Sequence, residues 1–156
     1  EPGLTDILIG TTPAREAIRP EVAPKLDVLP AGSSPPNPSE LLGSDAMHAL
    51  LGEVRREYDY IVVDTPPVLP VTDATVIATI ADAIILTIRS GETEELPAQR
   101  AAEQLRRVHA RIAGVVLNGV DTRRDRHYGY YRYRRNVPYA ARSPVLSLRR
   151  RLARLF

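Results

Sequence analysis

The sequence predicts an α/β domain with a mostly parallel sheet and flanking helices. Segments of strand composition alternate with segments of helical periodicity between residues 26 and 118, which is typical of parallel sheets with right-handed crossovers. Residues 82–89 are almost continuously apolar, as expected for a parallel strand covered on both faces. The 156 residues include no cysteine, so one core without disulfides or a cysteine-bound metal is expected.

The first third of the chain is predicted to hold short elements. A helix is expected over residues 3–10, because Gly10 is a typical helix terminator. Residues 11–24 contain three prolines and are predicted to form a loop or a single helical turn. A short strand, residues 26–30, leads into a Pro- and Ser-rich loop at residues 33–38.

The middle of the chain is predicted to hold two helices and a strand. One helix begins at Pro38 and breaks near residues 43–44, and Ser44 or Asp45 caps the next. Apolar residues recur at helical spacing in this second helix and predict its buried face; they are Met47, Leu50, Leu51 and Val54. A strand follows over residues 60–64.

The remaining elements alternate regularly. A helix is expected over residues 72–81 with Thr72 as its cap, then the apolar strand 82–89, a helix over 93–111 and a last strand over 113–118. The long helix begins with acidic residues and ends with arginines, which matches the helix dipole. Nowhere does an apolar run reach the roughly 18 residues needed to span a bilayer.

One carboxylate is predicted to lie at the tip of a buried strand. Residues 60–63 are β-branched and aromatic, and Pro66 and Pro67 cannot continue a ladder. Asp64 therefore follows the strand directly, where open α/β sheets bind ligands. A hydrophobic run followed by Asp is the Walker B arrangement, which positions Mg²⁺ beside nucleotide phosphates. The alternative is that Asp64 is an ordinary turn former.

A second feature is a cluster of tyrosines near the C-terminus. Five of the seven tyrosines lie within residues 127–139, interleaved with arginines. Such a segment is compatible with nucleic-acid stacking, with a membrane surface or with phenols that accept phosphate. The preceding Walker B pattern favours phosphate acceptors. The candidate acceptors are Tyr128, Tyr130, Tyr131, Tyr133 and Tyr139.

These motifs resemble the cytoplasmic kinase domain of the bacterial tyrosine autokinases, or BY-kinases, of capsule and exopolysaccharide export. The resemblance covers residues 1–139, and the Pro-Ala-Gly…Pro-Pro-Asn-Pro…Glu-Leu-Leu string is its most specific part. The strand before Asp64 is shared with the deviant Walker ATPases of plasmid partition and septum placement. The matching segments are residues 3–8, 29–42, 61–67, 71–74 and 115–118, with the tyrosine cluster.

The resemblance implies a P-loop NTPase fold of the deviant Walker type, with ATP and Mg²⁺ as cofactors. It implies that Asp64 supports the metal and catalysis, and that Thr65 orients the site. Arg89 is implied at a second strand tip facing the same crevice. Asn118 is implied at the adenine edge, although Asn-Gly is also an ordinary turn former. The loop at residues 33–38 is implied as a wall near the nucleotide or the subunit interface, or is a rigid connector.

The sequence departs from the family in one respect. The kinases carry a Walker A loop with its lysine and a second Asp-bearing strand before the segment that matches residues 3–6. The single lysine here, Lys25, lies between Pro24 and Leu26, and no GxxxxGK[ST] can be written. We therefore expect the C-terminal part of a longer kinase, incomplete at the N-terminal side of the fold and inactive by itself.

Charge divides the chain into an acidic body and a basic tail. Residues 1–121 hold 10 basic and 18 acidic residues, whereas residues 122–156 hold 11 arginines and one aspartate. Three regions are predicted: a part of an ATPase-like kinase domain (1–121), a flexible Arg/Tyr-rich tail (122–144) and a short basic amphipathic segment (145–156). In the last, Leu148, Leu152 and Leu155 have helical spacing, which predicts a small basic amphipathic helix.

The function expected from these features is tyrosine autophosphorylation that regulates polysaccharide synthesis and export. Tail tyrosines would be phosphorylated in trans by a neighbouring copy, and the partner would be a transmembrane activator or chain-length regulator. The basic tail could dock on anionic lipid or on an acidic neighbouring body; nucleic acid is disfavoured because no recognised binding fold accompanies the charge. The expected location is cytoplasmic, at the inner face of the bacterial membrane.

Two alternatives remain. A partition- or septum-type ATPase shares the strand that ends at Asp64, but the tyrosine cluster and the Pro-Pro-Asn-Pro loop count against it. A non-catalytic module that regulates polysaccharide chain length is supported by the missing Walker A lysine.

Overall fold

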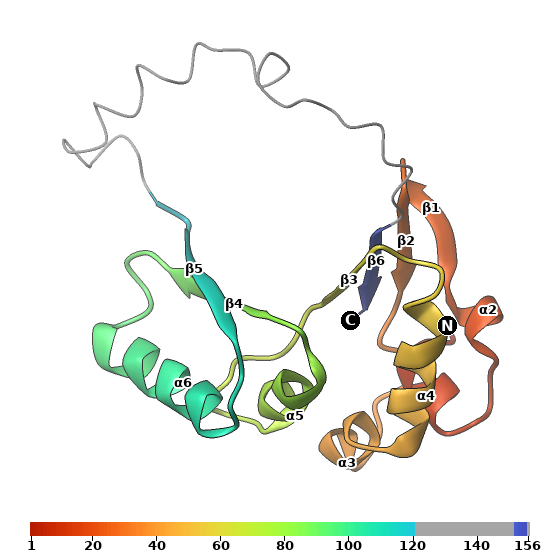
Figure 1. Ribbon diagram of the computed structural model, residues 1–156, viewed down its shortest axis with the longest axis horizontal. Helices are drawn as coiled ribbons and strands as arrows, with labels where there is room; N and C mark the ends of the chain where they lie inside the picture. Colours follow the sequence, from red (N-terminus) through yellow and green to blue (C-terminus); the bar gives the residue numbers. More distant parts are fainter. Residues whose placement is uncertain (121–151, 156) are drawn as a thin grey trace, which may run out of the picture.

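The structure is a computed structural model that describes residues 1–120 and the backbone of residues 152–155. Its strands form two sheets, one of four strands in the order β1-β2-β6-β3 and one of two strands, β4 and β5 (Figure 1). All strand pairs except β1 with β2 are parallel. The predicted α/β class with a mostly parallel sheet is confirmed.

The first sheet combines strands from both ends of the chain. β1 (Arg19–Ala23) is antiparallel to β2 (Leu26–Leu29). β6 (Leu152–Leu155) lies between β2 and β3 (Tyr60–Val63) and is parallel to both. The helix predicted for residues 145–156 is therefore wrong for residues 152–155, which pair as a strand.

β1 was not predicted, and a single helical turn was one of the two structures expected for residues 11–24. Residues 11–24 contain α2 (Ala14–Ala17) and then β1, whose residues are all exposed. An edge strand tolerates Pro20, because the missing N–H faces away from the ladder. Lys25 turns the chain into β2 with a φ of 65°. An exposed edge strand lacks the apolar alternation on which sequence prediction depends.

The helices around the first sheet follow the predicted order. α1 (Leu4–Leu8), α3 (Pro38–Leu42) and α4 (Asp45–Val54) lie on one side of the sheet (Figure 1). The Ser44 hydroxyl caps α4 by accepting a hydrogen bond from the Met47 amide at 3.4 Å. The predicted apolar face of α4 is buried in the main core together with Leu4, Leu8 and Leu29.

The second sheet belongs to a β-α-β unit. α5 (Asp73–Ile80) precedes β4 (Ile84–Arg89), and α6 (Glu95–Arg107) connects β4 to β5 (Ile112–Asn118). α6 ends earlier than predicted because His109 adopts a φ of 59°. The amides of His109 and Ala110 then bond to the carbonyls of Arg106 and Leu105 at 2.9 and 3.1 Å, which is a Schellman termination.

Part of the apolar surface of both sheets remains exposed. Ile85 of β4 is 65% exposed and Val115 of β5 is 57% exposed. Tyr60 and Val62, which alternate with half-buried residues on β3, are exposed as well. No pairing joins β3 to β4 among the strands that the structure describes. Within the described residues, one face of β3 and of β4 is thus exposed, and β5 is exposed after Ile112, whereas parallel strands are usually covered on both faces.

Candidate functional site

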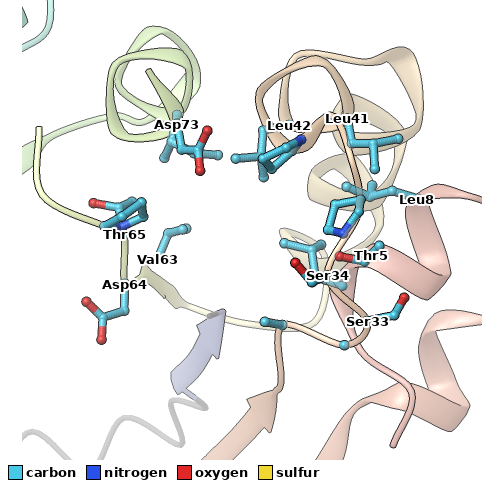
Figure 2. Close-up of a pocket in the computed structure, with 17 residues that line it drawn as sticks. Thr5, Leu8, Ser33, Ser34, Leu41, Leu42, Val63, Asp64, Thr65 and Asp73 are labelled. Atoms are coloured by element: carbon cyan, nitrogen blue, oxygen red, sulfur yellow. The ribbon is translucent and has the colours of Figure 1, made fainter. Parts of the chain in front are cut away.

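A cavity of about 290 Å³ adjoins the end of β3. Val63, Asp64 and Thr65 form one side of it, and residues from α1, α3 and the start of α5 form the others (Figure 2). Most of its lining is apolar, with leucines from α1 and α3 and Ile77 from α5. The predicted strand-end residues Asp64 and Thr65 therefore meet the loop at residues 33–38, which supplies Ser33, Ser34, Pro35 and Pro38.

Backbone contacts fix the wall between α1 and the end of β2. The amides of Leu4 and Thr5 bond to the carbonyls of Pro30 and Ala31 at 2.7 and 2.9 Å. A Cβ on Gly3 would lie 2.2 Å from the amide nitrogen of Gly32, so the two backbones can approach closely only because this residue is glycine. This contact holds Thr5 and the start of the 33–38 loop at the cavity.

Asp6 ties the same wall together. Its Oδ2 accepts a hydrogen bond from the Gly3 amide at 2.8 Å, and its Oδ1 accepts one from the Ser33 hydroxyl at 3.1 Å. The Gly3 amide bond is the main reason why the pKa of Asp6 is lowered, and the Ser33 bonds lower it further. Gly32 allows the approach through a φ of 83°. The charged form of Asp6 therefore stabilises this wall.

A second polar link joins α3 to α5 above the cavity. The Ser39 hydroxyl donates to Asp73 Oδ1 at 2.5 Å and lies 2.7 Å from the Thr72 hydroxyl. Thr72 precedes α5 as predicted, but its side chain makes no capping hydrogen bond. Asp73 also lines the cavity, so two carboxylates, Asp64 and Asp73, adjoin the same space. Sequence reasoning did not select Asp73 or Ser39, because 34 residues separate them.

Asp64 lies where the sequence places it, directly after β3. Figure 2 shows its carboxylate pointing away from Leu41, Leu42 and Leu8, whereas Asp73 lies on the side of Leu42. The Asp64 carboxylate thus points away from the apolar lining of the cavity, whereas Asp73 lies beside that lining. Asp64 is exposed and is followed by the hydroxyl-bearing Thr65. Such a carboxylate suits Mg²⁺, which binds one or two protein carboxylates together with water and substrate phosphates.

Arg89 and Asn118 lie together, but outside this cavity. They are paired in register at the ends of β4 and β5, and the Ser90 amide bonds to the Asn118 carbonyl at 2.8 Å. Arg89 forms an ion pair with Glu92 at 3.1 Å. The Asn118 side chain accepts a hydrogen bond from the Gly119 amide at 2.9 Å, which is the behaviour of a turn former. The four predicted site residues therefore occupy two places.

The two tyrosines outside the tail have different environments. Tyr58 is 7% exposed, and its hydroxyl donates to Asp27 Oδ2 at 2.7 Å. Asp27 is also buried and accepts a hydrogen bond from the Glu21 amide at 2.8 Å. Tyr60 is 53% exposed. The five predicted acceptor tyrosines lie outside the described residues, as do the predicted tail 122–144 and most of the predicted segment 145–156.

The described residues can be compared with the expected metal site and membrane partner. They contain no group of three or more His, Cys, Asp or Glu arranged to hold a metal ion. Among the same residues no helix is both long enough and apolar enough to cross a membrane.

Comparison with known proteins gives consistent matches. The family described as AAA domain matches residues 1–113. The chain is 39% identical over 129 residues to the tyrosine-protein kinase YwqD of Bacillus subtilis, covering 83% of this chain and 54% of YwqD. It is 35% identical over 129 residues to the putative tyrosine-protein kinase CapB of Staphylococcus aureus, covering 83% of this chain and 57% of CapB. The chain thus spans about half the length of these relatives.

Solved kinase domains also have this fold. The kinase domain of the Escherichia coli tyrosine kinase ETK matches with a TM-score of 0.72 and 35% identity, over 77% of this chain and 47% of that one. The VpsO kinase domain matches with a TM-score of 0.71 and 36% identity, over 77% and 59%. The resemblance to the bacterial tyrosine kinases is therefore confirmed. The chain belongs to the AAA domain family and is a relative of the bacterial tyrosine-protein kinases.

Proposed function

We propose that this chain is part of an ATP-dependent protein tyrosine autokinase, in which Asp64 is the Walker B carboxylate that positions Mg²⁺. The observation that carries the proposal is the place of Asp64, directly after β3 and beside a cavity, in a chain similar to named tyrosine-protein kinases over 83% of its length. ATP and Mg²⁺ are the cofactors that this arrangement suits.

Phosphoryl transfer depends mainly on positioning and on stabilisation of charge. A bound Mg²⁺ would neutralise the developing charge on the phosphates. The phenol oxygen of an acceptor tyrosine forms the new bond to the γ-phosphorus, the bond to the β,γ-bridging oxygen breaks, and ADP leaves. Because the phenol has an ordinary pKa near 10, its proton must pass to a carboxylate during transfer. We propose that Thr65, which is half-buried at the cavity, orients the site.

Arg89 and Asn118 are proposed as nucleotide contacts at the ends of β4 and β5. Support for this role is their position at the carboxyl ends of parallel strands, where ligands bind in open α/β sheets. Their side chains have local partners, Glu92 and Gly119, which a bound nucleotide would displace or share. Of the two, Arg89 has the stronger case, because an arginine can contact phosphate directly.

We further propose that the kinase regulates capsule or exopolysaccharide synthesis together with a transmembrane activator, at the inner face of the bacterial membrane. The resemblance supports this role. The charges also support self-association, because the segment 1–121 is acidic and the segment 122–156 is basic. The basic segment could bind anionic lipid instead, with about 1 kcal/mol per basic residue near the surface.

A non-catalytic chain-length regulator is the second candidate. Lys25, the single lysine of the sequence, turns the chain between β1 and β2 and so does not act as a phosphate-loop lysine. This chain by itself is accordingly expected to bind MgATP weakly. Calorimetry that gives micromolar affinity for the 156-residue chain would contradict this expectation.

The decisive experiment replaces Asp64 with Asn in the chain expressed with whatever its coding sequence places before Glu1. The change keeps the side-chain shape and removes the charge that the metal requires. Autophosphorylation, measured as phosphotyrosine by mass spectrometry, is expected to fall by roughly a hundredfold or more. Phosphate is expected on the tail tyrosines and not on Tyr58 or Tyr60.

Asp59→Asn is the matched control, because it removes a carboxylate at the other end of β3. An unchanged phosphotyrosine level in Asp64→Asn would show that Asp64 is an ordinary turn residue. No phosphotyrosine in the wild-type protein would favour the regulatory module.

A further inference from the structure

The end of β5 carries an Asn-Gly pair in which a backbone nitrogen lies against a side-chain amide. Asn118 and Gly119 are both exposed, and the Gly119 nitrogen lies 2.9 Å from the Asn118 Oδ1. A nitrogen held at this position is an internal nucleophile for the carboxamide carbon. We propose that Asn118 is a deamidation site, at which the chain converts its own asparagine to aspartate and isoaspartate without an enzyme. This inference goes beyond the proposed kinase function, because it requires neither nucleotide nor kinase activity.

The conversion of Asn118 needs only water. The Gly119 nitrogen gives up its proton to solvent base and forms a bond to the Asn118 Cγ. The bond from Cγ to the side-chain nitrogen breaks, and that nitrogen takes up a proton and leaves as ammonia, so that a cyclic imide remains. Water then opens the imide at either carbonyl. Opening at Cγ gives aspartate, whereas opening at the main-chain carbonyl gives isoaspartate, in which the backbone runs through the former side chain.

Gly119 presents the attacking nitrogen to the carboxamide. It has a φ of 68°, which residues with a Cβ rarely adopt, and no Cβ shields its nitrogen. A Cβ built at this position would lie 3.6 Å from the Arg89 Cγ, which is an ordinary van der Waals contact. The positive φ and not a lack of space therefore makes glycine the suitable residue for this geometry.

Two neighbouring groups stabilise the charge that develops on the peptide between Asn118 and Gly119. Loss of the nitrogen's proton spreads negative charge onto the Asn118 carbonyl oxygen, because the peptide bond is conjugated. The Ser90 amide donates to that oxygen at 2.8 Å, and a hydrogen bond to an anion is stronger than one to a neutral group. The Arg89 side chain lies beside Gly119 and adds a positive charge, which it shares with Glu92 at 3.1 Å. Both groups favour the attacking form of the nitrogen.

Asn37 is a matched comparison within the same chain. It precedes Pro38, whose nitrogen carries no hydrogen and so cannot become the nucleophile by this route. Asn37 is exposed as well, and its side chain donates to the Glu40 Oε2 at 2.6 Å. Exposure therefore does not distinguish Asn37 from Asn118, whereas the residue that follows each of them does.

Peptide mapping by mass spectrometry tests the site in the 156-residue chain. The chain and a synthetic peptide of residues 112–120 are incubated separately at one mildly alkaline pH, and circular dichroism confirms that the chain stays folded. Asn118 in the chain is expected to gain the mass of an exchange of NH₂ for OH, at a rate within about tenfold of that in the peptide, because the fold leaves it exposed. Asn37 should stay unchanged. Isoaspartate, identified by electron-transfer fragmentation, should form part of the product.

Variants of the same chain sharpen the assignment. Gly119→Ala should slow the conversion of Asn118 about tenfold, because alanine disfavours the positive φ and its Cβ shields the nitrogen. Arg89→Gln should slow it about two- to fivefold, the range for the loss of an exposed charge. Arg111→Gln, at the other end of β5, is the control and should leave the rate unchanged.

Two results would overturn the deamidation site. One is an Asn118 that stays unconverted in the folded chain after the peptide has been converted, because the fold would then protect it. The other is an equal rate of conversion in the wild-type chain, Gly119→Ala and Arg89→Gln, because the local geometry would then have no part in the reaction. Neither measurement uses a nucleotide, so both outcomes are independent of the kinase proposal.

Discussion

Residues 1–80 and the β4–α6–β5 unit differ in how completely they bury their apolar side chains. In the first region, Met47 and Leu29 are fully buried between α4 and the sheet. In the second, Ala101 and Leu105 of α6 are the buried hydrophobic residues that the structure describes, whereas Ile85 is 65% exposed. Two strands and one crossover helix cover only one sheet face. The first region therefore forms a closed core beside its cavity, and the second region leaves apolar strand residues exposed.

The largest expected contrast between the two regions is in stability. Met47→Ala removes a side chain with no exposed surface and should lower the free energy of unfolding by about 2–5 kcal/mol. Ile85→Ala should change it by less than about 0.5 kcal/mol, as for other surface substitutions. Urea unfolding of the 156-residue chain measures both. An equal loss of unfolding free energy in the two variants would mean that β4 is covered in solution. The two regions would then not differ in burial.

A smaller effect is expected at the buried pair formed by Tyr58 and Asp27. Tyr58→Phe removes a hydroxyl that donates to a buried carboxylate at 2.7 Å, which should lower the free energy of unfolding by about 1–3 kcal/mol. Tyr60→Phe, at an exposed tyrosine on β3, is the control and should stay within about 0.5 kcal/mol. Similar values for the two variants would show that the Asp27 contact contributes little.

The wall of the site should respond to pH through Asp6. Its folded-state pKa is lowered mainly by the Gly3 amide bond, so its contribution to stability is complete above the unfolded pKa of about 3.9. That contribution is lost as pH falls through the lower folded pKa. The thermal midpoint should therefore decline in acid less steeply in Asp6→Asn than in the wild-type chain. If the thermal midpoints of the two proteins fall in parallel as the pH is lowered, Asp6 does not cause the loss of stability in acid.

The smallest effect on stability is expected at Asn118, where β5 of the second region ends. Asn118→Ala removes a side chain that bonds to the next amide, and the free energy of unfolding should change by less than about 0.5 kcal/mol. Asn118 either contacts the adenine or is an ordinary turn former. The ATP affinity of the Asn118→Ala variant, expressed with any residues encoded before Glu1, should decide between these two roles. A fall of about tenfold would support contact with the adenine, and an unchanged value would support a turn former.

Sequence periodicity predicted the parts of the fold that local patterns control. The apolar spacing in residues 47–54, the Ser44 cap and the strand before Asp64 were all correct. β1 was missed because its pairing with β2 depends on backbone contacts of exposed residues. β6 was missed because leucines at helical spacing suggested a helix, whereas pairing with distant strands fixes a strand.

The site also divides into features that local sequence patterns predict and features that depend on contacts between distant residues. Asp64 was predictable because the signal lies within one continuous segment. The place of Asp73 was not, because it depends on Ser39 and on a cavity formed by four separate segments. Asn118 and Arg89 were predicted at strand ends and lie there, but their separation from the cavity could be seen only in three dimensions.

The place of β6 has a consequence for the order of folding. Its partners β2 and β3 lie in the first half of the chain, so β6 must close a very long loop before it gains any ladder hydrogen bonds. Loop closure costs entropy, and contacts between distant residues form slowly. The hairpin of β1 and β2 and the helices around it can assemble before the last residues of the chain are available. β6 should therefore join the sheet last and leave it first, with the earliest amide hydrogen exchange of that sheet.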